Sequence, residues 1–221
     1  MAIKHGDFVQ LDYIGRVDGR IFDLTDADVA KKEKIHNPKA KYGPVTIVVG
    51  AGHLLKGIDE ALVGKEVGEK VSVEVPPEKG FGKKSSKLIK IIPERSFKEQ
   101  KVQVHAGMQV NIDGLIGNVI SASAGRVILD FNHPLASKTL NYDVSILKKI
   151  DGQKEQLASL IEMYTNIKLD ADKIEVSEHN AKVNIKKLDE KMEKHIEDEA
   201  KKYIGLKKVE FTEEKTKEKK E

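Results

Sequence analysis

Cysteine and tryptophan are both missing from this chain, and tyrosine and phenylalanine together make up only 5% of it. Without cysteine there is no disulfide bond, cysteine nucleophile or thiolate metal site, and such a composition fits a reducing compartment. A large excess of charge of one sign is also missing, because 39 basic residues nearly balance 36 acidic ones and leave a net charge of +3. This balance argues against a protein that binds nucleic acid over a broad basic surface.

Long apolar runs are absent as well. No stretch approaches the roughly 18–20 apolar residues needed to cross a bilayer, and the N-terminal segment MAIKHGDFVQ has no signal-peptide core. We therefore expect a soluble, cytoplasmic protein. The hydrophobic share of 39% is sufficient for a packed core, while the 34% of charged residues predicts an extensive polar surface.

Alternating apolar residues predict strands in the first third of the chain. In the segment DFVQLDYIGRV, residues Val9, Leu11 and Tyr13 share one face, and the segment KVSVEVP repeats this pattern. The segment VTIVVG is apolar on nearly both faces and predicts a buried strand. Between VTIVVG and KVSVEVP, a stripe of apolar residues with helical spacing ends near Gly64. The stripe consists of Leu54, Leu55, Ile58 and Leu62.

The middle of the chain predicts a separate small β domain. After the segment VPPEKGFG, four short strand-like segments follow between residues 88 and 131: KLIKII, VQVHAGMQVNI, LIGNVISA and GRVILDF. The dipeptides Asp113-Gly114 and Ala124-Gly125 are typical of hairpin turns. A long strand then places Leu140, Tyr142, Val144 and Ile146 on one face.

The last third predicts a small α/β domain. Leu157, Leu160, Ile161 and Tyr164 follow the spacing of an amphipathic helix, and Asp189 is suited to cap a second helix. The segments KIEV, AKVNIKKL and KKVEF predict short strands around these helices. Residues 212–221 contain no apolar side chain, and we expect them to be disordered.

Four segments stand in the order and spacing of the FKBP-type prolyl isomerases, and the resemblance covers residues 1–151. VQLDYIGRVDGRIFDLT resembles the family's strand tyrosine followed by a turn with Phe-Asp, and PVTIVVGAGHLLKGIDEALVG resembles its central strand and helix. VGEKVSVEVPPEKGFG and TLNYDVSILKK resemble its later strands. The β segment interrupts the chain where the flap loop of the family lies, which resembles the SlyD-type subgroup with its insert-in-flap domain. The last third resembles the long archaeal members.

The resemblance implies an α+β fold: an FKBP-type curved antiparallel sheet around one helix, with an inserted small all-β domain and a small α/β C-terminal domain. The isomerase domain would comprise residues 1–84 and 132–151, and the inserted domain residues 85–131. The C-terminal domain would comprise residues 152–211, followed by a tail of residues 212–221.

The resemblance also implies catalysis of cis–trans isomerisation at Xaa-Pro bonds. The two isomers differ by only about 0.5–1 kcal/mol but exchange over tens of seconds or longer, because the partial double bond resists rotation. A catalyst must hold the twisted amide better than either planar form. Such a site needs no nucleophile, and we expect neither a cofactor nor a metal. The seven histidines are scattered, and the tail after Phe211 has no histidine or cysteine.

The family motifs assign site residues by position. The catalytic group would be Tyr13, Asp23, Phe81 and Tyr142. The substrate-binding group would be Phe22, Val45, Leu54, Leu55, Ile58, His133, Pro134, Leu135 and Leu140. Asp23 would polarise the Tyr13 hydroxyl or face the substrate carbonyl carbon, and the backbone N–H of Leu54 or Leu55 would bind the substrate. Taken alone, Tyr13 and Tyr142 fit better as ordinary strand residues, and Phe22-Asp23 fits any turn with an acidic cap. Leu54, Leu55 and Ile58 alone would be an ordinary buried helix face, and only the ordered set of motifs favours a site.

Two departures from the family pattern keep a second function open. Val45 and Ile58 stand where many members carry phenylalanine and tryptophan, so a non-catalytic holdase chaperone with a vestigial pocket is the alternative. In either case the partners would be unfolded or partly folded proteins with Xaa-Pro bonds. The inserted domain would hold them through apolar residues, namely Ile112, Leu115, Ile116 and Ile120.

The C-terminal domain has no motif of its own. Its core of about 60 residues is marginal alone, so we expect docking or a homodimer through this domain. Contact with nucleic acid or the ribosome is not favoured, because glutamate nearly cancels the lysine charge of the tail.

Overall fold

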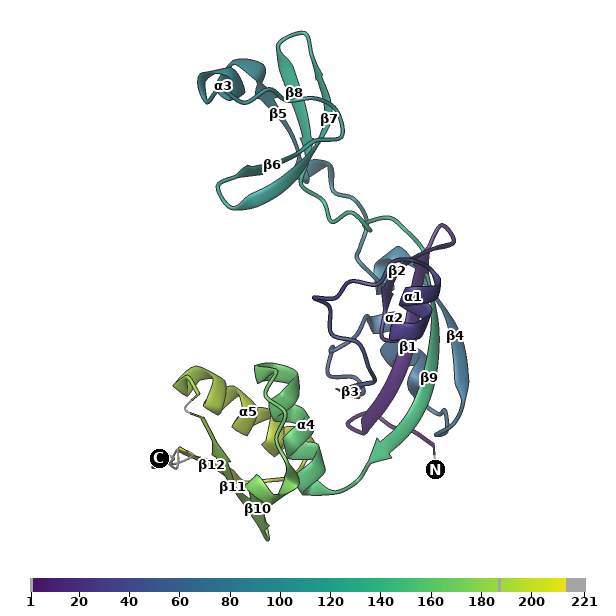
Figure 1. Ribbon diagram of the computed structural model, residues 1–221, viewed down its shortest axis with the longest axis vertical. Coiled ribbons are helices and arrows are strands. Elements are labelled where there is room, and N and C mark those ends of the chain that lie inside the picture. The colour runs from purple at the N-terminus through teal and green to yellow at the C-terminus, as the bar shows by residue number, and fades with distance from the viewer. Residues whose placement is uncertain (1, 187, 214–221) are drawn as a thin grey trace, which may run out of the picture. The chain divides into compact units, whose positions relative to one another are not determined.

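The computed structural model describes residues 2–186 and 188–213, which fall into two compact units (Figure 1). The first unit is formed by the segments Met1–Val73 and Asn141–Glu221, and the second by Glu74–Leu140. The second unit is thus an insertion into the first.

A five-stranded sheet organises the N-terminal part of the first unit. Its strands are β1 (Phe8–Val17), β2 (Arg20–Leu24), β3 (Val45–Val48), β4 (Lys70–Val75) and β9 (Leu140–Ile150). The order is β2-β1-β9-β4, with β3 also paired to β1, and β1 pairs antiparallel with β2, β3 and β9. Two short helices accompany the sheet, α1 (Ala27–Lys32) and α2 (Lys56–Leu62). The antiparallel sheet predicted from the family resemblance is confirmed.

The alternating residues occupy the buried face, as their period predicts. Val9 and Leu11 of β1 are fully buried, and so are Leu140, Val144 and Ile146 of β9. The helical stripe is buried less completely. Ile58 and Leu62 are 1% exposed, whereas Leu54 and Leu55 are half-buried because α2 begins only at Lys56.

The C-terminal part of the first unit holds a second, mixed sheet. Its elements are α4 (Gln153–Thr165), η3 (Ala171–Lys173), β10 (Ile174–Ser177), β11 (Asn180–Ile185), α5 (Glu190–Tyr203) and β12 (Lys208–Glu213). β11 pairs antiparallel with β10 and parallel with β12. Asp189 caps α5 as predicted, since its carboxylate accepts a hydrogen bond from the Lys191 N–H. β12 includes Thr212 and Glu213, which the sequence pattern places in the tail, and residues 214–221 lie outside the described residues.

This second sheet and its helices share a hydrophobic core with the first sheet. Phe8 of β1, Val48 of β3 and Ile150 of β9 belong to one cluster with side chains of α4 and α5. The C-terminal members include Leu157, Leu160, Ile161, Ile196 and Ala200. A segment of about 60 residues is marginally stable alone, and the shared cluster adds apolar contacts to its core.

The second unit carries its own four-stranded sheet. Its elements are η1 (Pro77–Lys79), η2 (Ser86–Leu88), β5 (Ile89–Pro93), α3 (Glu94–Glu99), β6 (Gln109–Ile112), β7 (Leu115–Ser123) and β8 (Arg126–Asp130). The order is β5-β8-β7-β6, and every pair is antiparallel. A small core holds this sheet together, formed by Phe97, Val110, Val119, Val127 and Leu129. The inserted β sheet is therefore confirmed.

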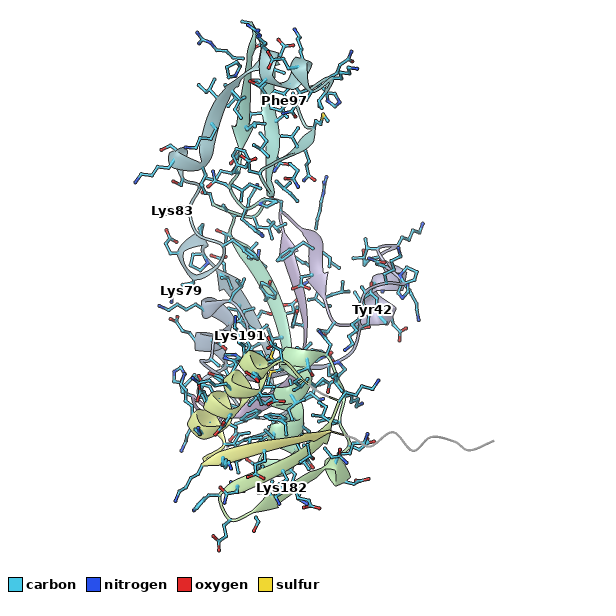
Figure 2. All side chains as sticks on the ribbon, turned by 90° about the vertical axis from the view of Figure 1, so that its left-hand side faces the viewer. Tyr42, Lys79, Lys83, Phe97, Lys182 and Lys191 are labelled. Atoms are coloured by element: carbon cyan, nitrogen blue, oxygen red, sulfur yellow. The ribbon has the colours of Figure 1, made fainter. Side chains whose placement is uncertain are left out.

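Two details of the inserted unit differ from the strand pattern. Helix α3 lies where the pattern predicts no helix: it follows Pro93 and turns Phe97 into the core, where its side chain is 7% exposed (Figure 2). The predicted strand VQVHAGMQVNI contributes only its last residues, from Gln109 onward. Gly107 explains the late start, because its φ of +84° interrupts the extended backbone.

None of the helices in the described ranges is long and apolar enough to span a bilayer.

Candidate functional site

Three aromatic rings from three strands meet in the first unit. Tyr13 of β1, Phe22 of β2 and Tyr142 of β9 pack edge to face, with Tyr142 between the other two. The ring centroids of Tyr13 and Tyr142 lie 5.8 Å apart, and those of Phe22 and Tyr142 also lie 5.8 Å apart. Such pairs stabilise each other beyond the area that they bury, so the three rings form a defined aromatic wall.

Gly15 makes this packing possible, and the sequence motif does not single it out. In the sheet register Gly15 lies opposite Asp23 on one side and Tyr142 on the other, at a point where the pairing of β1 with β2 shifts. A Cβ at this position would stand 2.7 Å from Cε1 of Tyr142 and 3.2 Å from Cζ of Phe22. Only glycine lets both rings lie over the strand.

The Tyr13 hydroxyl lies near the Asp23 carboxylate. Burial raises the pKa of Tyr13 far above its ordinary value, and the nearby charge of Asp23 and a hydrogen bond to its carboxylate raise it further. Burial and the charge of Asp23 likewise raise the pKa of Tyr142. Both phenols are therefore neutral hydrogen-bond donors at any physiological pH.

The aliphatic residues of the predicted site come from β3 and the start of α2. Val45 begins β3 and is half-buried, and Leu54 and Leu55 lie in the turn that leads into α2. Leu55 is the N-cap residue of α2, and its carbonyl accepts the first helical hydrogen bond, from the Ile58 N–H. Ile58 itself is 1% exposed.

A buried carboxylate fixes the turn before α2. Asp59 is 5% exposed, and its Oδ2 accepts a hydrogen bond of 3.3 Å from the Gly52 N–H. Burial raises the pKa of this carboxyl group, and backbone N–H groups of Gly50 and Gly52 oppose the rise. Both glycines have a φ of +80°, in the left-handed region that favours glycine. The hydrogen bond from Gly52 to Asp59 thus helps to fix the turn that carries Leu54 and Leu55.

His53 joins the same turn to the C-terminal part of the unit. Its Nδ1 accepts a hydrogen bond of 3.1 Å from the Val48 N–H, so the proton of the neutral ring resides on Nε2. Nε2 lies 3.1 Å from the hydroxyl of Tyr164 on α4, to which it donates. The Tyr164 hydroxyl in turn donates to Glu199 on α5 at 3.5 Å, and its ring packs edge to face on His195. No spacing rule predicts a contact across 111 residues.

The remaining predicted site residues belong to the second unit. Phe81 stacks on His133, with centroids 4.1 Å apart and planes 7° apart. Nδ1 of His133 accepts a hydrogen bond of 3.1 Å from the Leu135 N–H, which fixes the orientation of the ring. His133 and Pro134 are exposed, Leu135 is half-buried, and Leu140 is fully buried.

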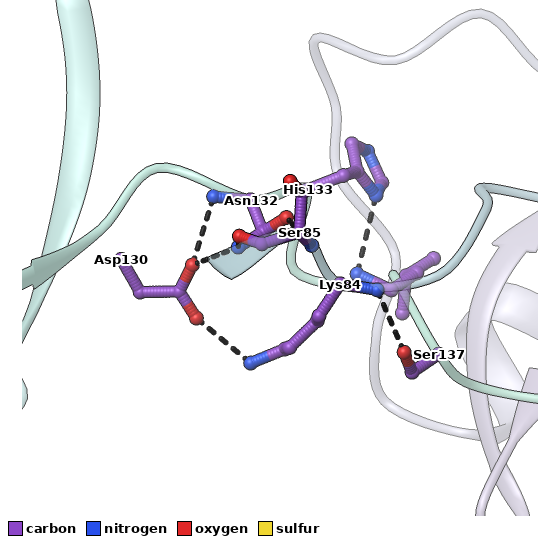
Figure 3. A network of polar contacts seen from close by, with 7 residues as sticks. Lys84, Ser85, Asp130, Asn132, His133 and Ser137 are labelled. Carbon is purple, nitrogen blue, oxygen red and sulfur yellow. Dashed lines mark hydrogen bonds and ion pairs between the residues drawn. The ribbon is translucent and has the colours of Figure 1, made fainter. Parts of the chain in front are cut away.

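A polar network ties together the two chain segments that enter and leave the inserted sheet (Figure 3). Asp130 accepts hydrogen bonds from Lys84 Nζ at 2.8 Å and from the backbone and side chain of Asn132 at 2.9 and 2.7 Å. Asn132 also bonds the backbone N–H and C=O of Ser85, and Ser137 Oγ accepts from the Lys84 N–H. The bond from Lys84 is the main reason why the pKa of Asp130 is lowered.

The residues predicted to bind unfolded chains are exposed with one exception. Leu115, Ile116 and Ile120 of β7 are 64%, 63% and 50% exposed, whereas Ile112 is half-buried against the core of the inserted sheet. Ile91 of β5 is 63% exposed and is missing from the predicted set, because its segment has the pattern of an ordinary half-buried strand.

Comparison with known proteins agrees with this geometry. Residues 1–147 match the family "FKBP-type peptidyl-prolyl cis-trans isomerase". A "Short-type peptidyl-prolyl cis-trans isomerase" of Methanocaldococcus jannaschii is 40% identical over 144 residues, which are 65% of this chain and 92% of that protein. A "FKBP-type peptidyl-prolyl cis-trans isomerase SlyD" of Treponema pallidum is 28% identical over 166 residues, 73% of this chain and 86% of that protein. The chain therefore belongs to the FKBP-type peptidyl-prolyl cis-trans isomerases.

Proposed function

We propose that the isomerase acts on unfolded polypeptides, with the aromatic wall of Tyr13, Phe22 and Tyr142 as its prolyl site and the inserted sheet as a holding surface. The observation that carries the catalytic part is the meeting of these three rings, with the charge of Asp23 close to the Tyr13 hydroxyl. Membership in the family supports the reaction itself.

The rings suit the chemistry of a twisted amide. A planar Xaa-Pro amide is stabilised by resonance and by water at its oxygen, and rotation removes the resonance. Apolar ring faces can surround the proline while excluding water, which penalises the planar form more than the twisted one. Tyr142 and Phe22 would contact the proline ring, and the neutral phenol of Tyr13, beside the Asp23 carboxylate, would form the polar side of the site.

The other predicted residues would complete the binding surface. Val45 and Ile58 would provide its aliphatic side, and a backbone N–H of Leu54 or Leu55 would bond the substrate chain. Phe81 and His133 of the inserted unit stack on each other, and the family resemblance assigns them to catalysis and substrate binding together with Pro134, Leu135 and Leu140. This function uses no cofactor.

The prolyl site is tested by the isomerisation rate of an Xaa-Pro tetrapeptide. We expect Tyr142→Ala and Asp23→Ala to lower kcat/KM by at least about tenfold, since well-oriented groups commonly contribute this much. Glu175→Ala, which removes an exposed carboxylate on β10, is the matched control. A folded Tyr142→Ala variant with the activity of the wild type would refute the assignment.

One face of the inserted sheet supports the holding role. In the register of β5, β8 and β7, Ile91 lies opposite Ile128, which lies opposite Ser121. Alternation places five isoleucines on the face that points away from the core. They are Ile89, Ile91, Ile116, Ile120 and Ile128, referred to below as the isoleucine face. A grouped apolar surface of this kind is typical of an interaction site.

The holding role is tested by comparing two substrates. The double variant Ile91→Lys/Ile116→Lys should lower the ratio of activity on a refolding protein to activity on the tetrapeptide, because the protein alone would use the isoleucine face. Lys90→Glu, which changes an exposed residue on the opposite face of β5, is the control. A ratio equal to that of the wild type would remove the isoleucine face from the function. An inactive wild type that still suppresses aggregation would favour the holdase alternative.

A further inference from the structure

A groove of about 900 Å³ runs between the first sheet of the first unit and helix α4. One wall is formed by residues 41–47, which include the first three residues of β3, and the other by α4 and residues 166–170. Two hydrogen bonds join the walls: His53 Nε2 with the Tyr164 hydroxyl, and Lys41 Nζ with Asn166 Oδ1 at 3.5 Å. The groove is therefore held open by defined contacts and is as large as the sites that bind sizeable ligands.

The groove continues from the proposed prolyl site. Tyr13, Val45 and Leu54 line it, and the family motifs assign each of them to catalysis or substrate binding. Tyr42, labelled in Figure 2, lines it as well and stacks on His36 with centroids 5.1 Å apart. A chain bound at Tyr13 and Leu54 thus has a path that leads away along α4.

The free edge of β3 favours an extended chain as the occupant. Within the described sheet β3 pairs only with β1, and the Val49 N–H bonds to the Asp7 carbonyl. By the alternation of an antiparallel ladder, Val45 and Ile47 also bond toward β1, while the N–H and C=O of Thr46 point away from it. Such an edge can accept an added strand.

The charges along the groove are mixed. Lys41 and Lys168 are positive, and Glu155, Glu162 and Asp170 are negative. A nucleic acid would meet these carboxylates, whereas a polypeptide of varied sequence finds both donors and acceptors. The lining also contains apolar surface from Ala158 and Met163.

We propose that this groove binds the stretch of polypeptide that continues from the Xaa-Pro bond, paired with the edge of β3, so that the C-terminal segment forms part of the substrate site. This proposal rests on the proposed function. The lining residues of α4 run from Glu155 to Glu162 and on to Asn166, a rise of about 16 Å. An extended chain covers that length with about five residues.

Binding is tested with three fluorescent peptides measured by anisotropy. One is an Xaa-Pro tetrapeptide, and the others extend it by six residues on the N-terminal or the C-terminal side. We expect one extension to lower Kd by about fivefold or more, since two backbone hydrogen bonds at Thr46 account for that much. Ser159→Arg, which fills the groove from α4, should abolish the gain. Ser177→Arg, an exposed position on β10, is the matched control and should keep it.

A second pair of variants addresses the strand edge and covers the case in which Ser159→Arg does not fold. Thr46→Pro removes the outward N–H without removing a bond to β1, and proline is tolerated at such edges. It should abolish the gain, whereas Thr46→Val, which keeps the N–H, should retain it. Thermal unfolding verifies that each variant is folded.

Two results would overturn the proposal: no gain from either extension, or a gain that survives both Ser159→Arg and Thr46→Pro. The latter would place the extra residues elsewhere, for example on the isoleucine face. The isomerisation rate of the tetrapeptide tests the proposed function separately. If the wild type does not accelerate isomerisation of the tetrapeptide but Ser159→Arg still abolishes the gain in peptide affinity, the groove is a binding site and the catalytic assignment is wrong.

Discussion

Replacing Gly15 by alanine should displace the aromatic wall. The added Cβ would lie 2.7 Å from Cε1 and 2.9 Å from Cζ of Tyr142. Carbon atoms in contact prefer about 3.5–4.0 Å, so the ring must retreat by roughly 0.8 Å or the strand must move. Overpacking of this kind costs about 1–3 kcal/mol, which corresponds to a fall in Tm of about 2–12 °C for a protein of this size. The reduced freedom of the unfolded chain offsets only about 0.4–1 kcal/mol of it.

The effect on catalysis should exceed the effect on stability. A displacement near 1 Å in a catalytic site can cost about 100-fold in rate, so we expect kcat/KM for the tetrapeptide to fall by at least about tenfold at temperatures where the variant is folded. Gly152→Ala is the control for activity, because a Cβ there meets no atom within 4 Å and its φ is −78°. Its own effect on Tm is measured separately, since Gly152 is the N-cap of α4 and alanine is disfavoured there. Gly15→Ala with wild-type Tm and activity would refute the claim that glycine is required for the packing of Tyr142.

Three further predictions concern the polar contacts. Tyr164→Phe leaves Nε2 of His53 without its partner and should destabilise the first unit by about 1–3 kcal/mol in a denaturant titration, and equal midpoints would contradict this. Burial lowers the pKa of His53, so its contribution to stability is complete above its unfolded pKa of about 6.5 and declines as the pH falls toward the lower folded value. The fall in Tm between pH 7.5 and 5.5 should therefore be smaller in His53→Asn. The hydrogen bond from Lys84 lowers the pKa of Asp130, so Asp130 also stabilises the fold less as the pH falls. Its contribution to stability is complete above about pH 3.9 and is lost as the carboxylate is protonated. Asp130→Ala should speed hydrogen exchange at the Ser85 and Phe131 amides, and unchanged protection would show that the network is dispensable.

Periodicity in the sequence predicts the strands of the first sheet because one face of each is buried. The alternation of Val9 and Leu11, and of Leu140, Val144 and Ile146, is visible without any knowledge of their partners. Side-chain preferences likewise predict the Asp189 cap, since capping is a local interaction.

Contacts between distant segments leave no such signal. His53 and Tyr164 each have the pattern of an ordinary residue of a loop or a helix, and only the fold brings them within 3.1 Å. Helix α3 escapes prediction for a related reason: its six residues are too few to show a helical period, and Phe97 is its one buried side chain. The aromatic residues of the proposed site come from the family motif, whereas the contacts of Gly15 and Asp59 and the groove require the three-dimensional arrangement.

The two additions to the prolyl isomerase fold differ in how they could be gained or lost during evolution. The inserted sheet has a core of its own, and its incoming and outgoing segments are joined to each other by the network around Asp130. A gene rearrangement could remove it or transplant it as a module. The C-terminal segment covers Phe8, Val48 and Ile150, which would face water without it. Truncation at Asp151 should therefore expose these three apolar side chains and should not yield a stable protein of the short type. Loss of the segment during evolution would have required replacement of the apolar side chains that it covers.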